Sequence, residues 1–320
     1  WTAPACFNPE DTMKIVIVGP GALGSLIAAL LTKTKEDIWL LDKDEARAAL
    51  LERKGLRLEG LASMEAKVNA SADPKEIGAA DLVILCVKSY DTKKAMTLAR
   101  PLVPERGAVL TLQNGIGNIE IANEVMGEER VIGGVTIVGA TLVDTGVVRY
   151  TGKGETVIGK IDGSITVELR TIRELFIRAG LQTRISRDIK GALWSKLVIN
   201  AGINALTALT RLPNGKLLDY EGTRTVMRQA VTEAVKVAKR KRIKLTYDDP
   251  LSKVEAVCEA TAGNISSMLQ DVLKKRRTEI DAINAVIVRH GQESGIPVPV
   301  NTLLVELVKT IESSYGAAVS

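Results

Sequence analysis

A short apolar run that ends in closely spaced glycines constrains the fold of this chain more than any other segment. The segment reads Ile15-Val-Ile-Val-Gly-Pro-Gly-Ala-Leu-Gly24, and an apolar helical stretch and a second apolar run that ends at Asp42 follow it. A strand, a GxGxxG turn and a helix in this order are typical of a Rossmann-type domain. The segment therefore predicts a dinucleotide bound where the first strand meets the first helix.

Each glycine of the turn has its own expected role. Gly19 permits the tight turn, Gly21 lets the backbone approach a pyrophosphate, and Gly24 allows the helix to pack against the strand. The start of the helix offers unpaired N–H groups to phosphates. The alternative is a turn whose glycines serve packing alone. The expected cofactor-binding residues here are Gly19, Pro20, Gly21, Ala22, Leu23 and Gly24.

The end of the second strand bears on which dinucleotide is bound. Asp42 would ordinarily bond the adenine ribose diol and repel a 2′-phosphate, which favours NAD. Lys43 and Lys88 argue the other way, because either cation could reach a 2′-phosphate, although each could equally lie in solvent. The residues by themselves leave this choice open.

The pattern of apolar runs divides the chain into two parts. Strand-like and helix-like runs alternate in the first part, which predicts a parallel sheet, and long helical periodicities follow. Strands are expected at 15–18, 38–41, 82–87, 109–112, within 131–150 and at 156–161, and helices at 25–34, 44–54, 92–100 and 118–126. In the second part, helices are expected at 192–207, 224–240, 251–270, 278–290 and 301–315.

These patterns predict an α/β protein of two domains. A Rossmann-type domain with a parallel sheet is expected over residues 13–187, an all-α domain over 188–320, and an active site in the cleft between them. Residues 1–12 precede Met13 and are interpreted as an N-terminal extension or cloning remnant.

Composition excludes several classes of protein. The net charge of +5 is spread along the sequence, and the densest basic runs lack interleaved aromatic residues, so we expect no nucleic acid partner. The three cysteines are few and odd in number, which gives no disulfide framework and no metal motif. No run of apolar residues is long enough for a membrane span, and we expect a cytoplasmic protein with no membrane partner.

Three polar residues spaced four apart interrupt the apolar segment 192–207. Lys196, Asn200 and Asn204 share one stripe of the helix, because each four-residue step drifts only about 40° around the axis. Such a stripe needs polar partners, which either a cleft or solvent could supply. His290 is the only histidine and lies near a helix end, so Lys196 is the candidate proton donor for a carbonyl reduction.

Several separated motifs occur together in this chain. They are the glycine turn, Cys86-Val-Lys-Ser-Tyr90, Gln113-Asn-Gly-Ile-Gly117, the helix at 194–208, Leu212-Pro-Asn-Gly215, Asn264-Ile-Ser-Ser-Met-Leu-Gln-Asp271 and Arg277-Thr-Glu-Ile-Asp-Ala-Ile-Asn284. In this combination the chain resembles the ketopantoate reductase family, also called 2-dehydropantoate 2-reductases, over residues 13–315.

The resemblance implies reduction of 2-dehydropantoate to D-pantoate, usually with NADPH, on the route to pantothenate and coenzyme A. Lys196 matches the family's general acid and Glu279 the acid that engages the substrate hydroxyl, so both are assigned to catalysis. Asn114 matches an asparagine near the nicotinamide and that lysine. Further matches are Lys88 and Ala140 for the cofactor, Asn200, Asn204 and Asn214 for the substrate, and Ser267 for its carboxylate.

Simpler interpretations of these residues stay open. Asn114-Gly115 and Asn214-Gly215 are ordinary turn signals, Ser267 could bond backbone, and Thr278 with Asp281 could cap a helix. NADPH-using members of the family often place an arginine where this chain has Asp42-Lys43, so the resemblance does not settle the cofactor. Because Lys43 and Lys88 remain available, we expect NADP(H), with NAD(H) as the second option. The alternative functions are reduction of another branched 2-keto acid and non-catalytic dinucleotide sensing. The expected assembly is a monomer or a homodimer.

Overall fold

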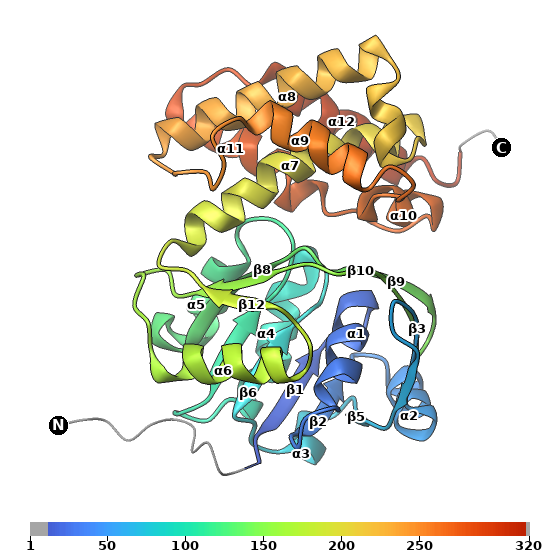
Figure 1. The fold of residues 1–320 in the computed structure, drawn as a ribbon, viewed down its shortest axis with the longest axis vertical. Coiled ribbons are helices and arrows are strands. Elements are labelled where there is room, and N and C mark those ends of the chain that lie inside the picture. Colours follow the sequence, from blue (N-terminus) through green and yellow to red (C-terminus); the bar gives the residue numbers. More distant parts are fainter. Residues whose placement is uncertain (1–11, 318–320) are drawn as a thin grey trace. The chain divides into compact units, whose positions relative to one another are not determined.

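The computed structural model describes residues 12–317, and backbone contacts divide the chain into two compact units (Figure 1). Among the described residues, unit 1 comprises 12–113 and 117–189, and unit 2 comprises 114–116 and 190–317. The segment interpreted as an extension, residues 1–12, lies outside the described part of the chain except for Thr12.

Unit 1 is built on an eight-stranded sheet of order β12-β11-β8-β7-β6-β1-β2-β5. Its strands are β1 (Lys14–Val18), β2 (Asp37–Leu41), β5 (Asn69–Ser71), β6 (Leu82–Leu85), β7 (Ala108–Thr111), β8 (Val131–Thr136), β11 (Thr156–Gly159) and β12 (Thr183–Ile185). Neighbouring strands are parallel except β8 and β11. The strand order reverses direction at β1, and ligands bind at the carboxyl ends of the strands at such a point.

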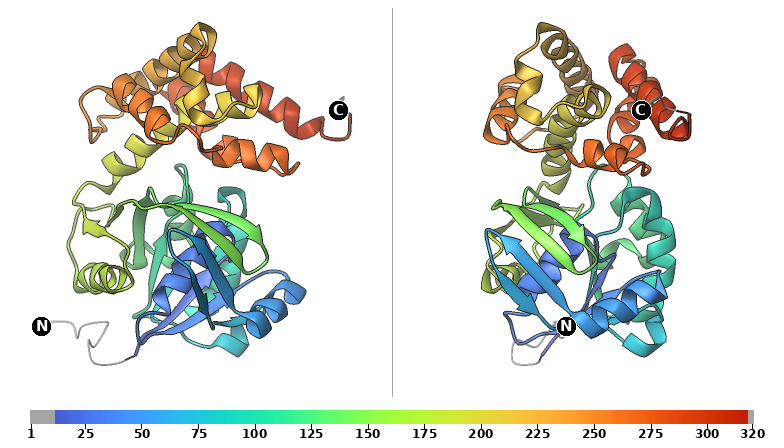
Figure 2. Two further views of the ribbon diagram at one scale, coloured as in Figure 1. Left: turned by 45° about the vertical axis from the view of Figure 1, so that its right-hand side comes forward. Right: turned by 90° about the vertical axis from the view of Figure 1, so that its right-hand side faces the viewer.

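A second, four-stranded sheet of order β4-β3-β10-β9 lies beside the first helix of unit 1 (Figure 2). It consists of β3 (Leu56–Gly60), β4 (Met64–Ala66), β9 (Gly139–Asp144) and β10 (Val147–Gly152). The helix α1 (Ala22–Leu31) packs against β1 and β2 on one side and against β3, β9 and β10 on the other. Two of the strands expected within 131–150 thus belong to a sheet that the sequence pattern did not predict.

Helices cover both faces of the main sheet. Besides α1, unit 1 contains α2 (Glu45–Lys54), α3 (Pro74–Ile77), α4 (Thr92–Ala99), α5 (Asn118–Met126) and α6 (Val167–Arg178), with short 3-10 turns η1 (Ser89–Asp91), η2 (Arg100–Leu102) and η3 (Glu128–Arg130). The helices α1 and α6 lie on one face, and α4 and α5 lie on the other (Figure 2). The α/β architecture with a parallel sheet is confirmed.

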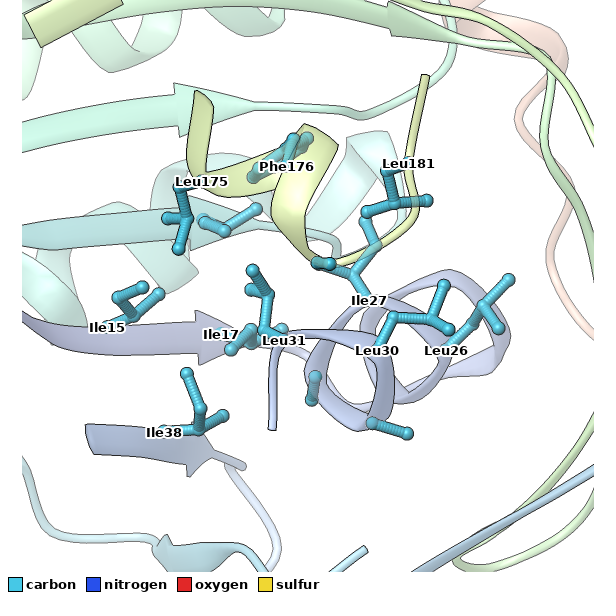
Figure 3. Packing of buried hydrophobic residues seen from close by; sticks show 14 of the residues in the cluster. Ile15, Ile17, Leu26, Ile27, Leu30, Leu31, Ile38, Leu175, Phe176 and Leu181 are labelled. Carbon is cyan, nitrogen blue, oxygen red and sulfur yellow. The ribbon is translucent and has the colours of Figure 1, made fainter. Parts of the chain in front are cut away.

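The core beneath α1 fixes the helix that follows the glycine turn. Figure 3 shows Ile27 and Leu31 of α1 close to Ile17 of β1 and Phe176 of α6, and each of these side chains is at most 2% exposed. Burying a side chain of this size stabilises the fold by roughly 1.5–3 kcal/mol. The start of α1 is therefore held rigidly at the carboxyl end of β1.

Unit 2 is helical, as expected. Its elements are α7 (Ile189–Thr210), η4 (Asn214–Leu218), α8 (Glu221–Arg240), α9 (Pro250–Ala260), α10 (Ser267–Leu273), η5 (Ile280–Ala282), α11 (Asn284–Ser294) and α12 (Pro299–Ser313). Among the described residues, α7 alone is long and apolar enough to cross a membrane, but 72% of its most apolar window is buried inside the protein. This burial is what the central helix of a packed core shows.

Two helices predicted for unit 2 are wrong in extent. The expected helix 251–270 is broken between α9 and α10, because the backbone of 262–264 accepts hydrogen bonds from Asn214 N and Gly215 N and Ser266 caps the next helix. The expected helix 278–290 begins only at Asn284, because the Thr278 hydroxyl accepts from Ile280 N and holds a tight turn before it.

Candidate functional site

The glycine turn has the geometry that a dinucleotide needs. Gly19 has φ +87°, and a Cβ there would lie 2.5 Å from Val87 Cγ1. A Cβ on Gly24 would lie 2.3 Å from the Gly19 carbonyl oxygen. Next to Gly21, by contrast, no heavy atom lies within 4 Å of a Cβ position. Packing therefore requires two of the glycines, and the third leaves open space at the N-terminus of α1, where anions bind.

The other residues of the turn complete the helix start. Pro20 is buried and its carbonyl accepts a hydrogen bond of 3.0 Å from the Ser25 hydroxyl, while Ala22 and Leu23 form the first turn of α1. No side chain caps this helix among the described residues. The first N–H groups of α1 are thus available to phosphate oxygens.

Asp42, at the end of β2, is not a free carboxylate. Its side chain is 1% exposed and accepts from Asp44 N and from both Nε and Nη2 of Arg47, the latter at 2.6 Å. This pairing raises the pKa of the Arg47 guanidinium, which is still 41% exposed. From the sequence we considered only Asp42, Lys43 and Lys88 for the preference between NAD and NADP. We did not consider Arg47, whose side chain extends from the first turn of α2 and neutralises the charge of Asp42.

The two lysines differ in their surroundings. The Lys43 ammonium lies 3.0 Å from an Asp91 carboxylate oxygen and is 71% exposed. Lys88 is half-buried in the segment that follows β6, and Val87 of that segment touches Gly19. Ala140 lies on β9 of the second sheet, half-buried against the core beneath α1.

A buried glutamine that sequence reasoning did not select connects the loops of unit 1. The Gln113 side-chain amide donates to the Val87 carbonyl at 3.0 Å and to the Thr92 hydroxyl at 2.8 Å, and it accepts from the Thr111 hydroxyl. Gln113 therefore fixes the segment after β6 relative to β7. Its place within the Gln113 to Gly117 motif was a signal, but nothing in the sequence indicates that the side chain is buried.

The loop of residues 114–116 belongs to unit 2 and carries the partner of Lys196. Lys196 Nζ donates to Asn114 Oδ1 at 2.7 Å. Lys196 itself lies on α7, half-buried, in a helix whose other sides fill the core of unit 2. The structure thus brings together two residues that are 82 positions apart and were both expected in the site.

The electrostatics of Lys196 suit a proton donor. Removal of water by burial lowers the pKa of Lys196 to about 8, and the negative charge of Glu279 acts in the opposite direction. Glu279 is 5% exposed and immediately precedes the η5 turn. The Glu279 charge favours the ammonium form of Lys196, but the effect of desolvation is larger. Near pH 7 most of Lys196 is still protonated, and the proton is held less tightly than on an exposed lysine.

The expected asparagine stripe lies on α7. Asn200 is half-buried and Asn204 is 6% exposed, and within residues 12–317 neither side chain has a hydrogen-bond partner in the protein. Polar groups in this state can bind an external molecule or water. The apolar sides of the same helix pack into the core, so the stripe is the polar edge of an otherwise buried helix.

Asn214 and Ser267 both belong to unit 2. Asn214 Nδ2 donates to the Thr261 hydroxyl at 2.9 Å, and its Oδ1 has no partner within residues 12–317. Ser266, not Ser267, caps α10, and its hydroxyl lies 2.6 Å from that of Thr207, one turn beyond Asn204. Ser267 is the exposed first residue of α10. The simpler interpretation, in which Ser267 bonds the backbone of its own helix, thus describes Ser266 instead.

A parallel sheet with a phosphate-compatible glycine turn, together with a helical unit that holds a half-buried lysine, is typical of one class of protein, the two-domain nicotinamide-dependent reductases. The family model described as "Ketopantoate reductase PanE/ApbA" matches residues 15–163, and the model "Ketopantoate reductase PanE/ApbA C terminal" matches residues 188–312. The chain belongs to the ketopantoate reductase family and is an enzyme, as the resemblance of its motifs predicted.

Individual relatives agree with the family models. A 2-dehydropantoate 2-reductase of Archaeoglobus fulgidus is 39% identical over 94% of this chain and 98% of its own length. The crystal structure of a PanE/ApbA family ketopantoate reductase from Ralstonia eutropha superimposes with a TM-score of 0.87 at 36% identity, covering 94% of this chain and 99% of that one. The ternary structure of D-mandelate dehydrogenase with NADH and anilino(oxo)acetate gives 0.88 at 26% identity over 96% and 100%.

Proposed function

We propose that this enzyme reduces 2-dehydropantoate to D-pantoate with NADPH, in the cytoplasm, as a step toward pantothenate and coenzyme A. The observation that carries the proposal is the Lys196 ammonium bonded to Asn114, with Glu279 beside it and a pKa lowered to about 8. The names of the relatives support the substrate. A monomer or a homodimer would serve this reaction equally.

The reaction divides between hydride and proton transfer. When bound, the nicotinamide supplies a hydride for the ketone carbon. Lys196 gives its proton to the ketone oxygen, which leaves a neutral amine and an alcohol. Asn114 holds the ammonium in one direction through its side-chain oxygen. The partly buried setting strengthens the interaction of Lys196 with the developing alkoxide.

The substrate presents three polar groups, and the chain offers a partner for each. Glu279 would accept a hydrogen bond from the terminal hydroxyl, and Ser267 would donate one to the carboxylate. Asn200, Asn204 and Asn214 supply amides with unused hydrogen-bonding capacity. The three asparagines and Ser267 all lie in unit 2, as Lys196 and Glu279 do.

For the cofactor we propose NADPH, bound over the Gly19 to Gly24 turn. Arg47 and Lys43 would meet the 2′-phosphate, and the pairing of Asp42 with Arg47 removes much of the repulsion that the carboxylate would otherwise exert. Lys88 and Ala140 are the further cofactor contacts proposed. NADH is the second candidate, favoured by Asp42 itself and by the NADH bound in the D-mandelate dehydrogenase structure.

A second candidate substrate is another branched 2-keto acid, because the neighbour of similar fold is named a D-mandelate dehydrogenase and not a ketopantoate reductase. The test is a set of steady-state rates with 2-dehydropantoate and with 2-keto acids of the same skeleton that lack the hydroxymethyl group. We expect kcat/KM to be highest for 2-dehydropantoate. A preference for an acid without that group would remove the role of Glu279 and favour the second candidate. Nucleotide binding without oxidation by any keto acid would favour a sensor.

A further inference from the structure

The 114–116 loop approaches the turn that follows Glu279 at one point. Gly115 has φ +86°, and a Cβ there would lie 2.4 Å from the Ala282 carbonyl oxygen and 2.6 Å from Ala282 Cβ. Ile116 N donates to the same carbonyl oxygen at 3.1 Å. Only glycine allows this approach, both because of its backbone conformation and because of the space.

The turn on the other side of this contact carries Glu279. Ala282 N donates to the Glu279 carbonyl at 3.0 Å, which closes the η5 turn, and Ala282 is 8% exposed. The Ala282 peptide thus bonds to Glu279 through its N–H and to the 114–116 loop through its carbonyl. The segments that carry Asn114 and Glu279, the two residues that act on Lys196, are therefore both hydrogen-bonded to the backbone of Ala282.

We propose that Gly115 and Ala282 are positioning residues that hold Asn114 and Glu279 in register around Lys196, and so set how readily Lys196 holds its proton. The inference rests on the role proposed for Lys196. Neither residue need contact the substrate, because both act through the placement of the two acceptors. Glu279 is the charged group that acts on Lys196.

The test uses Gly115→Ala, with Gly117→Ala as the matched control. Gly117 lies in the same sequence motif with φ +107°, but no heavy atom lies within 4 Å of its Cβ position. Both variants bear similar backbone strain, and only Gly115→Ala collides with Ala282. Selective ¹³C labelling of lysine, with Lys196→Met to assign its resonance, gives the pKa of Lys196 by NMR titration without any need for turnover.

In the unaltered enzyme the Lys196 resonance should titrate near pH 8. Gly115→Ala displaces Asn114 from the ammonium, and loss of one charge-assisted hydrogen bond should lower the Lys196 pKa by about one unit. Gly117→Ala should leave it unchanged. Equal titrations in all three proteins, or equal shifts in both variants, would overturn the proposal.

A second variant and an activity assay separate the proposal from misfolding and from the proposed function. If Gly115→Ala does not fold, Ala282→Gly, which gives the backbone of the turn after Glu279 more freedom, should shift the same titration in the same direction by less. A Lys196 pKa unchanged in Ala282→Gly as well would then contradict the proposal. A shift of the Lys196 pKa in a protein that reduces no keto acid would refute the proposed function and leave the positioning role standing.

Discussion

At the scale of single residues, Lys196 shows how burial and charge divide the control of one proton. Burial lowers its pKa to about 8, and Glu279 limits that change. Sequence reasoning selected Lys196 as the candidate proton donor because it interrupts an apolar helix and the only histidine, His290, lies near a helix end. It could not predict the net direction of the pKa shift, because that depends on how much water the fold removes around the side chain.

The pH dependence of the rate follows from the lowered pKa. A general acid acts in its protonated form, so kcat should be level below about pH 8 and fall about tenfold per pH unit above it. Glu279→Gln removes the charge that raises the pKa of Lys196 and keeps the size of the side chain. The fall should therefore begin at lower pH in this variant. Steady-state kcat from pH 5 to about 10 measures it, and a profile that coincides with that of the unaltered enzyme would contradict the role of Glu279.

Arg47 carries the prediction about cofactor choice. Arg47→Ala removes a cation expected at the 2′-phosphate and exposes the buried charge of Asp42, so NADPH binding should weaken by about tenfold or more relative to NADH. Asp42→Asn removes the repelling charge and should change the ratio of the two dissociation constants in the opposite direction. Fluorescence titration with each dinucleotide gives both constants. If the ratio of the NADPH and NADH dissociation constants stays the same in both variants, residues other than Asp42 and Arg47 distinguish the 2′-phosphate from the 2′-hydroxyl.

At the scale of elements, the glycine turn could be predicted from the sequence, whereas the helix α6 was not predicted. The turn was predicted with the roles that the packing around Gly19, Gly21 and Gly24 supports. The helix α6 was missed, although Leu169, Ile172, Leu175 and Phe176 lie on one face and Thr166 caps it. Its signal was therefore in the sequence. The break between α9 and α10 was not, because it depends on long-range hydrogen bonds from Asn214 N to the Asn264 carbonyl and from Gly215 N to the Ala262 carbonyl.

The glycine turn also gives a prediction that separates packing from binding. Gly24→Ala places a Cβ 2.3 Å from the Gly19 carbonyl and should destabilise the protein by about 1–3 kcal/mol. Gly21→Ala meets no atom within 4 Å, so its unfolding temperature without ligand should stay the same. Added NADPH should stabilise Gly21→Ala much less than the unaltered protein, because the methyl group fills the space for the pyrophosphate. If NADPH stabilises Gly21→Ala as much as the unaltered protein, the pyrophosphate does not bind next to Gly21.

At the scale of the whole molecule, the residues proposed for cofactor binding and those proposed for proton transfer belong mainly to different units. Unit 1 has the turn, Arg47 and the segment after β6, all of which suit a dinucleotide, and unit 2 has Lys196, Asn114 and Glu279. The alternation of strands and helices predicted the first unit, and helical periodicity predicted the second. That the 114–116 loop belongs to unit 2 could not be predicted, because it depends on long-range contacts such as those of Asn114 with Lys196 and of Ile116 with Ala282.

The central claim is that Lys196 gives the proton in an NADPH-dependent reduction of 2-dehydropantoate. The most direct measurement follows the loss of NADPH absorbance with 2-dehydropantoate for the unaltered enzyme and for Lys196→Ala, with thermal unfolding to show that the variant is folded. We predict one pantoate formed per NADPH oxidised, and a kcat lower by roughly a hundredfold or more in the variant. Near-equal rates in the two proteins, or no oxidation of NADPH by the unaltered enzyme, would contradict the claim.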